Sequence, residues 1–240
     1  MIAAAHLLLL LGLWTGQSRT ASEGARQLVV VTTPAWDSVS GTLRRYARAS
    51  ARAPWRAVGG PVPIVVGQTG LAWGDDALGR RRDPRKREGD GKAPAGRFPL
   101  QTAFGFPPPS AMDWVRMPYL ALDDRTECVD DSASAHYNSV VDRDRVRRVD
   151  WTSAERMRSI ELYRLGVIVG YNARPVRRGR GSCIFLHIWR SAGSPTSGCT
   201  AMPADDLEAI VRWLDPARRP ALVQLPAGEY ARLRRAWSLP

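Results

Sequence analysis

Short apolar segments separated by turn-forming residues dominate this chain, and they restrict its fold more than any other feature. Each segment is between five and nine residues long, which is typical of strands. No regular alternation of strand and helix patterns links them, so a doubly wound parallel sheet is not expected. The sequence therefore predicts a mainly β domain with a few peripheral helices. The predicted strands are residues 27–33, 61–67, 118–122, 164–172, 182–189 and 221–225.

Four further segments fit helices. Residues 40–50 could form a short basic helix, and residues 229–237 a closing one. Thr152 and Glu155 have the spacing of a capping box, so we interpret Glu155 as a helix cap rather than a catalytic carboxylate. The fourth helix is predicted from Pro203 onward, because an apolar stripe recurs there with helical spacing. Its members are Leu207, Ile210, Val211 and Leu214.

Two loops carry distinctive composition. In the stretch KAPAGRFPL, residues 92–100, Pro94 and Gly96 predict a sharp reversal that leads into a strand. Residues 75–91 are strongly charged and are interpreted as a solvated surface loop. A lid, or a loop that contacts a cell-wall polymer, is the alternative.

The N-terminus resembles a secretory signal. Residues 2–14 form a mostly apolar run of 13 residues, whereas a membrane span needs about 20. Small residues follow, so we expect a signal peptide at residues 1–21 with cleavage within about 16–22. No Lys or Arg precedes the run, which leaves a short uncleaved anchor or a misassigned start as alternatives. Residues 27–240 are expected to form one domain.

The formal net charge of +12 favours anionic partners. Acidic lipid and acidic wall polymers are consistent with it, so peripheral contact with a membrane is one option. The sequence contains no nucleic-acid-binding motif and no basic ladder interleaved with aromatic residues, and we expect no nucleic-acid partner.

The stretch FLHIWRSAGSPTSGCTAM, residues 185–202, concentrates reactive groups in a chain with only three Cys and three His. His187 lies on a predicted strand, and Cys199 follows a Gly/Ser/Pro loop that lets the chain turn back. A thiolate nucleophile, an imidazole base and the backbone N–H groups of Gly198 and Cys199 as oxyanion donors would suffice for acyl transfer. A small buried cysteine and a structural histidine are the alternative. Zinc is not expected, because no close ligand pair is present.

These residues resemble the YkuD (ErfK/YbiS-type) L,D-transpeptidase family, in particular a periplasmic Gram-negative branch. TSGCTA, residues 196–201, is similar to the family's signature around its cysteine, and KAPAGRF, residues 92–98, is similar to its T-P-x-G-x-F element with Ala93 in place of Thr. The resemblance is strongest over residues 61–225. It implies a β-sandwich catalytic domain in which Cys199 is the nucleophile and His187 the base. A backbone carbonyl, by position that of Ile188, would orient the imidazole.

The chain departs from the family pattern around the cysteine. Ser197 stands where a His often precedes Gly-Cys, and Ala201 where an Arg or Asn often follows. Substrate contacts are therefore assigned by expectation to Thr196, Ser197, Arg190 and the pair Tyr137 and Asn138. For the segment around Tyr137 and Asn138, a capped turn is the alternative.

The resemblance leaves Cys128 and Cys183 to pair with each other, since Cys199 must stay reduced. Their disulfide would brace one wall of the site. A bond between Cys183 and Cys199 would instead act as a redox switch.

The resemblance implies an exported, periplasmic enzyme that forms 3→3 cross-links between peptidoglycan peptide stems without a metal or cofactor. An L,D-carboxypeptidase, exchange of D-amino acids, and a non-catalytic wall-binding module are the alternatives. The oligomeric state is not predicted.

Overall fold

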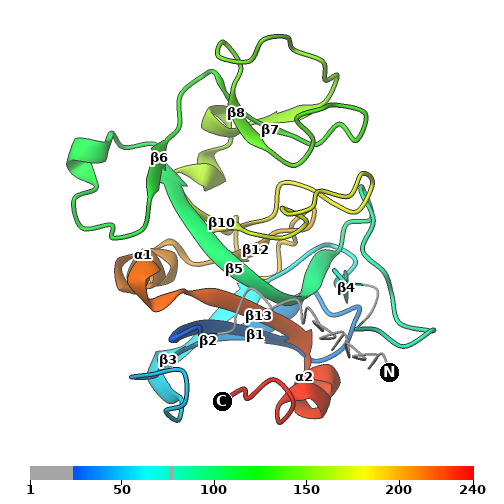
Figure 1. The fold of residues 1–240 in the computed structure, drawn as a ribbon, viewed down its shortest axis with the longest axis vertical. Helices are drawn as coiled ribbons and strands as arrows, with labels where there is room; N and C mark the ends of the chain where they lie inside the picture. The colour runs from blue at the N-terminus through cyan, green and yellow to red at the C-terminus, as the bar shows by residue number, and fades with distance from the viewer. Residues whose placement is uncertain (1–23, 76–77) are drawn as a thin grey trace, which may run out of the picture.

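The computed structural model describes residues 24–75 and 78–240 (Figure 1). The predicted signal peptide at residues 1–21 lies outside the described residues. Within them, no helix is both long enough and apolar enough to span a membrane.

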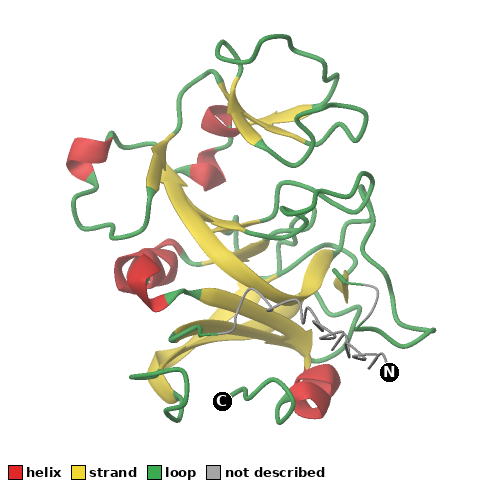
Figure 2. Ribbon diagram, viewed as in Figure 1, coloured by secondary structure: helices red, strands yellow, loops and turns green. Residues whose placement is uncertain are grey.

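The described chain is mainly β, which confirms the predicted fold class (Figure 2). Its two α-helices are α1 (Ala204–Trp213) and α2 (Ala227–Leu233), and short 3-10 turns occupy Pro109–Ala111, Met157–Ser159, Glu161–Tyr163 and Pro216–Arg218. The strands are β1 (Gln27–Thr33), β2 (Ser40–Ala47), β3 (Arg56–Val65), β4 (Leu71–Trp73), β5 (Ala93–Gly105), β6 (Tyr119–Ala121), β7 (Thr126–Val129), β8 (Val140–Asp142), β9 (Ala154–Arg156), β10 (Leu165–Val169), β11 (Phe185–Ile188), β12 (Thr200–Met202) and β13 (Ala221–Pro226).

One large sheet organises the described residues. Its strands follow the order β10-β11-β12-β3-β2-β1-β13-β5-β4, with β6 paired to β5. Because β10 pairs with β5 as well as with β11, the hydrogen-bonded path returns on itself and encloses the core. The β12–β3 contact is the weak link in this path, since its register holds the single pair Ala201 and Val65. The strand that follows Cys199 is thus attached mainly through β11.

Helix α1 packs its predicted apolar stripe into the core of the large sheet. The side chains of Leu207, Ile210, Val211 and Leu214 are fully buried, and the helix contacts β10 and β11. Burial of a side chain of this size contributes about 1.5–3 kcal/mol to folding. The helix therefore supports the strand that carries His187 from behind.

Residues 40–50 are not helical, and the predicted basic helix is wrong. Strand β2 runs between β1 and β3, with antiparallel partners on both sides. Its Leu43 is fully buried. Pairing on both edges satisfies the backbone of β2, and this tertiary context overrides a local helical preference.

The predicted reversal at Pro94 and Gly96 is also wrong. Both residues lie within β5, the longest strand, which starts at Ala93. Gly96 has a φ of 148°, and a Cβ there would lie 2.8 Å from the ring of Phe98. The glycine serves a close side-chain approach within a strand rather than a turn.

A second, three-stranded sheet of order β8-β7-β9 lies beside the large one (Figure 1). Its strand β9 and the following 3-10 turns replace the helix predicted to start at Trp151. Glu155 pairs in register with Cys128 of β7, so the capping interpretation of Glu155 is wrong. Thr152 instead binds the carboxylate of Asp131 through its N–H and hydroxyl groups.

Candidate active site

A pocket of about 290 Å³ brings together two separate stretches of the chain, residues 155–163 and 187–201. Its lining includes Glu155 from β9, Tyr163 from the 3-10 turn before β10, His187 from β11, and Cys199 just before β12. The large sheet thus contributes the two residues expected to react. The small sheet contributes a carboxyl group that the sequence reasoning placed elsewhere.

The position of His187 is set by strand pairing on both sides. It lies opposite Gly166 of β10 and opposite Ala201 of β12. Its Nδ1 lies 2.7 Å from the carbonyl oxygen of Ile188, the main-chain group that the family resemblance places beside the imidazole. A carbonyl only accepts hydrogen bonds, so Nδ1 carries the proton and Nε2 is left as the basic nitrogen.

His187 is neutral at physiological pH. Burial of its ring lowers the pKa to about 4, and the contact with the Ile188 carbonyl opposes this shift. A neutral imidazole with an unprotonated Nε2 is the form that a general base requires.

Cys199 is the one cysteine in the chain outside a disulfide, and its side chain is buried. Its thiol donates to the Cys183 carbonyl oxygen at 3.4 Å and accepts from the Phe185 N–H at 3.3 Å. Burial and, next, the charge of Glu155 raise the pKa of this thiol, whereas hydrogen bonds from Phe185 and Tyr163 lower it. The resting site therefore holds a neutral thiol and a neutral imidazole in the same pocket, so attack must be coupled to proton transfer.

Thr196 organises the turn before the cysteine. Its hydroxyl donates to the carbonyl of Cys199 at 2.7 Å and accepts from the N–H of Gly198 at 3.1 Å. The Gly198 amide, expected to be an oxyanion donor, is therefore engaged within the turn. Thr196 lines the pocket, but its hydroxyl holds the backbone.

Two polar side chains of the pocket, Glu155 and Tyr163, were missed by the sequence reasoning. The Tyr163 hydroxyl donates to Glu155 Oε2 at 2.7 Å, and Tyr163 lowers the pKa of the Cys199 thiol that lines the same pocket. Burial raises the pKa of the Glu155 carboxyl to about 7. No spacing rule distinguishes these residues, because their meeting depends on how β9 lies against the large sheet.

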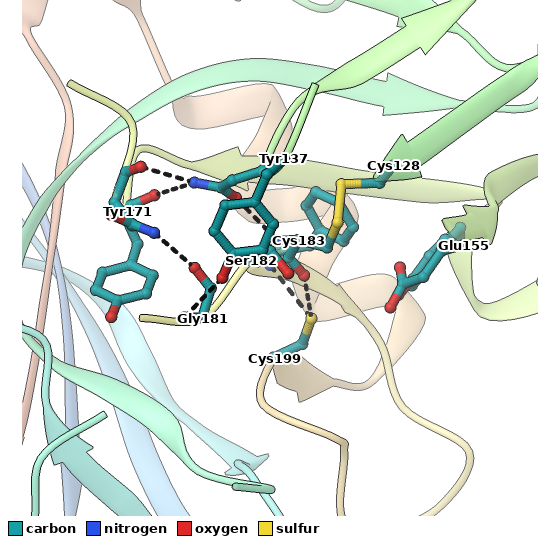
Figure 3. The surroundings of a disulfide bond; sticks show 12 residues. Cys128, Tyr137, Glu155, Tyr171, Gly181, Ser182, Cys183 and Cys199 are labelled. Carbon is teal, nitrogen blue, oxygen red and sulfur yellow. Dashed lines mark hydrogen bonds between the residues drawn. A yellow bond between two sulfur atoms is a disulfide. The ribbon is translucent and has the colours of Figure 1, made fainter. Parts of the chain in front are cut away.

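A disulfide joins Cys128 of β7 to Cys183, directly before β11, and links the two sheets next to the pocket (Figure 3). Cys183 has a left-handed backbone with φ of 54°. This conformation accompanies two main-chain contacts, because the Cys183 N–H donates to Asn138 Oδ1 at 3.0 Å and its carbonyl accepts from Cys199. The disulfide thus anchors the residue against which the Cys199 thiol rests.

Tyr137 and Asn138, considered as substrate contacts, do not line the pocket that contains Cys199. The Tyr137 hydroxyl donates to the Glu88 carboxylate and accepts from the N–H of Gly181. The Asn138 amide donates to the carbonyls of Tyr171 and Asn172. Their side chains fasten a turn to neighbouring loops, which agrees with the structural alternative.

The described part of the charged loop of residues 75–91 is hydrogen-bonded to the segment around Tyr137 through Glu88. Glu88 also accepts from the Ser182 hydroxyl at 2.7 Å. Lys86 is only 3% exposed and forms an ion pair with Asp90 at 2.6 Å. The end of the loop nearest the site is therefore a packed part of the fold rather than a wholly solvated surface segment.

Arg190 and Ser197 line the pocket and are solvent-exposed. Both come from the loop between β11 and β12. Of the expected substrate contacts, these two have side chains available at the mouth of the pocket. Within residues 24–75 and 78–240, no cluster of three or more His, Cys, Asp or Glu side chains could hold a metal ion.

Comparisons with known proteins give a family match. Residues 55–223 match the family model YkuD, described as the L,D-transpeptidase catalytic domain. Among solved structures, the helical cell shape determining protein Pgp2 from Campylobacter jejuni is similar, with 16% sequence identity and a TM-score of 0.41. The alignment covers 86% of this chain and 51% of the Pgp2 chain, so this chain spans about half of that protein. No curated protein sequence matches the chain significantly.

Proposed function

Because the chain belongs to the YkuD family of L,D-transpeptidase catalytic domains, we propose that it is a cysteine acyltransferase acting on peptidoglycan peptide stems. One observation carries the proposal. Cys199 and His187 line the same pocket, and the Ile188 carbonyl holds His187 in the tautomer that a base needs.

In the first half of the reaction, Cys199 Sγ attacks the carbonyl carbon of the L-centre of diaminopimelate in a tetrapeptide stem. The thiol proton passes to Nε2 of His187 as the carbon–sulfur bond forms. His187 then protonates the amine of the terminal D-Ala, the amide bond breaks, and D-Ala leaves. The product of this half is a thioester on Cys199.

In the second half, the side-chain amine of a neighbouring stem attacks the thioester. Neutral His187 removes a proton from this amine, and the thiolate leaves and is reprotonated. The result is a 3→3 cross-link, with Cys199 and His187 returned to their starting forms. Water as the acceptor would instead make the protein an L,D-carboxypeptidase.

The exposed guanidinium of Arg190 at the pocket mouth fits recognition of a stem carboxylate, with Ser197 as a neighbouring hydroxyl. These side chains would supply the polar contacts that the family often makes with a His at position 197 and an Arg or Asn at position 201. For the developing oxyanion, the N–H of Cys199 is the donor we assign. The Gly198 amide joins it only if Thr196 releases it.

We further propose that the protein acts in the periplasm. The apolar N-terminal run supports export. The Cys128–Cys183 disulfide supports an oxidising compartment, because such bonds rarely persist in the cytoplasm.

The test is to incubate the purified protein with a disaccharide-tetrapeptide of the diaminopimelate type and to identify products by intact-mass and fragment mass spectrometry. We expect D-Ala release and a cross-linked dimer. Cys199→Ala should abolish both, and His187→Gln should slow them by about 10²–10⁴. The matched control is His136→Gln, because His136 does not line the pocket; its rate should stay within about twofold.

The remaining outcomes each select an alternative. D-Ala release without a dimer identifies a carboxypeptidase, and incorporation of an added free D-amino acid identifies exchange. If no D-Ala is released and a carbapenem leaves no adduct on Cys199, the enzyme hypothesis fails and a wall-binding module replaces it.

A further inference from the structure

One buried group next to the nucleophile has no part in the reaction just described. Glu155 is half-buried, and burial of its carboxyl group is the main cause of its raised pKa. Burying a carboxylate without a cationic partner is costly. Among the charged groups that act on Glu155, Asp130 and Glu88 carry the same sign and raise its pKa further.

Tyr163 connects this carboxyl group to the nucleophile. Its ring is wedged among Phe104, Phe185 and His187, with centroid distances of 5.8, 5.4 and 5.2 Å. The hydroxyl donates to Glu155 Oε2 at 2.7 Å. Tyr163 lines the pocket together with Cys199, close enough that each group shifts the pKa of the other. Aromatic packing on several sides restricts where this hydroxyl can lie, so it stays in the pocket that Glu155 and Cys199 also line.

The Tyr163 hydroxyl has a single proton, and the two neighbours compete for it. When Glu155 is ionised, the carboxylate accepts this proton, and its negative charge disfavours a thiolate at Cys199. When Glu155 is protonated, its own O–H can donate to the tyrosine oxygen. The tyrosine hydroxyl can then donate its proton to the sulfur. A hydrogen bond to an ionised thiolate is stronger than one to a neutral thiol.

We propose that Tyr163 is a positioning residue that hydrogen-bonds to the Cys199 thiolate, and that a protonated Glu155 releases the Tyr163 hydroxyl for this contact. The inference deepens the proposed function and rests on Cys199 being its nucleophile. During attack, the thiol proton still goes to His187, the Tyr163 O–H turns to the sulfur, and Glu155 keeps its proton. Glu155, Tyr163 and Cys199 together lose one proton, which His187 receives.

Five further titratable or charged groups surround Glu155, Tyr163 and Cys199, and they come from four parts of the fold. His187 of β11 is neutral, as shown above. Asp130 follows β7, and Glu88 belongs to the loop of residues 75–91, and both act on Glu155. Lys86 from the same loop lowers the pKa of Cys199, and Arg190 lies at the pocket mouth. The variants below leave all five groups in place.

The experiment is alkylation of Cys199 by iodoacetamide between pH 6 and 10, followed by intact-mass spectrometry on the purified protein. This reagent reports thiolate formation directly. Glu155→Gln keeps an uncharged donor next to Tyr163, and we expect the apparent pKa of Cys199 to fall by about one unit, which gives about tenfold faster alkylation below that pKa. Tyr163→Phe should shift it in the opposite direction by a similar amount. The double variant should lose the acceleration seen in Glu155→Gln.

The molecule contains a matched control, a second tyrosine hydroxyl bonded to a glutamate. Tyr137→Phe removes the donor to Glu88 and should leave the midpoint of the alkylation profile unchanged. A merely structural effect of Tyr163→Phe would change the rate by the same factor at every pH. That result, or unshifted midpoints in both Tyr163→Phe and Glu155→Gln, would overturn the inference.

Failure of this inference and failure of the proposed function are separable. Alkylation needs no peptidoglycan fragment. Shifted midpoints in a protein that releases no D-Ala would support the role of Tyr163 and reject the proposed substrate. D-Ala release with unshifted midpoints would do the reverse.

Discussion

The two sheets of this protein differ in what holds them together. The large sheet encloses a contiguous apolar core, to which fully buried residues such as Val29, Leu186 and Ile210 belong. The small sheet of β7, β8 and β9 packs Cys128 and Val140 against a second, smaller apolar cluster, and it also contains a buried acid. Glu127 on β7 is 3% exposed, accepts from Trp151 Nε1 at 2.7 Å, and pairs with Arg143 at 2.9 Å.

The pocket lies between these two regions and takes a different kind of residue from each. The large sheet presents His187 on β11, whose register is fixed by main-chain pairing on both sides, and Cys199 directly before β12. The small sheet presents Glu155 and, through Cys128, the disulfide. The large sheet thus carries the two residues proposed to react, and the small sheet contributes to their surroundings.

The largest effect should come from opening a cavity in the large sheet's core. Ile210→Ala removes a fully buried side chain from α1 and should lower the free energy of unfolding by about 2–5 kcal/mol. Urea denaturation measures this change. Val176→Ala is the control, since Val176 is 41% exposed and should cost less than about 0.5 kcal/mol.

Removing the disulfide should be the next largest change and should affect the two regions unequally. We expect the double variant Cys128→Ser/Cys183→Ser to lose about 2–4 kcal/mol. Hydrogen exchange should show loss of protection in β7, β8 and β9 while β1 and β13 keep theirs. Equal loss of protection in both sheets would contradict the proposed division.

Weakening the ion pair between Glu127 and Arg143 in the small sheet should lower stability by a smaller amount. Glu127→Gln keeps an acceptor for Trp151 but weakens the contacts with Arg143, and we expect a loss of about 1–3 kcal/mol. The same substitution at Glu161, which is 74% exposed and pairs with Arg164, should change stability by less than about 0.5 kcal/mol. Similar losses in the two variants would mean that burial of Glu127 is energetically unimportant.

The smallest effect concerns the pH dependence of stability. The pKa of Glu155 is raised from 4.5 to about 7, so the folded state holds this proton more tightly and stability falls as pH rises through this window. The pKa of His187 is lowered from 6.5 to about 4, so the folded state binds this proton less tightly than the unfolded chain. Stability therefore falls as pH falls from about 6.5 to about 4. The two trends oppose each other between about pH 4.5 and 6.5.

Glu155→Gln should remove one of these trends and leave the other visible. Over the shared window, the stability of the variant should rise with pH by at most about 1.4 kcal/mol per pH unit, whereas that of the wild-type protein should vary less. Denaturant titrations at several pH values test this. Parallel curves for the two proteins would show that Glu155 titrates as it does in an unfolded chain.

Sequence patterns were informative wherever a local period reported burial. The i, i+3, i+4, i+7 stripe that begins in α1 identifies side chains that the structure buries. They failed for residues 40–50, which have helical local features but lie between two strands. They also failed for Glu155, since a capping-box spacing is the same whether a helix follows or not.

By itself, the sequence determined the mainly β class and the helix α1 through short-range spacing, and its motifs resemble the family that the comparison shows. It also predicted Cys199 and His187 as the pair for acyl transfer. The tertiary structure alone decided that Thr196 engages the Gly198 amide, that Tyr137 and Asn138 fasten a turn, and that Glu155 and Tyr163 line the pocket of Cys199. The physical reason is that pKa values and hydrogen-bond partners depend on burial. The groups that bury Glu155 and Cys199 come from strands far apart in the chain.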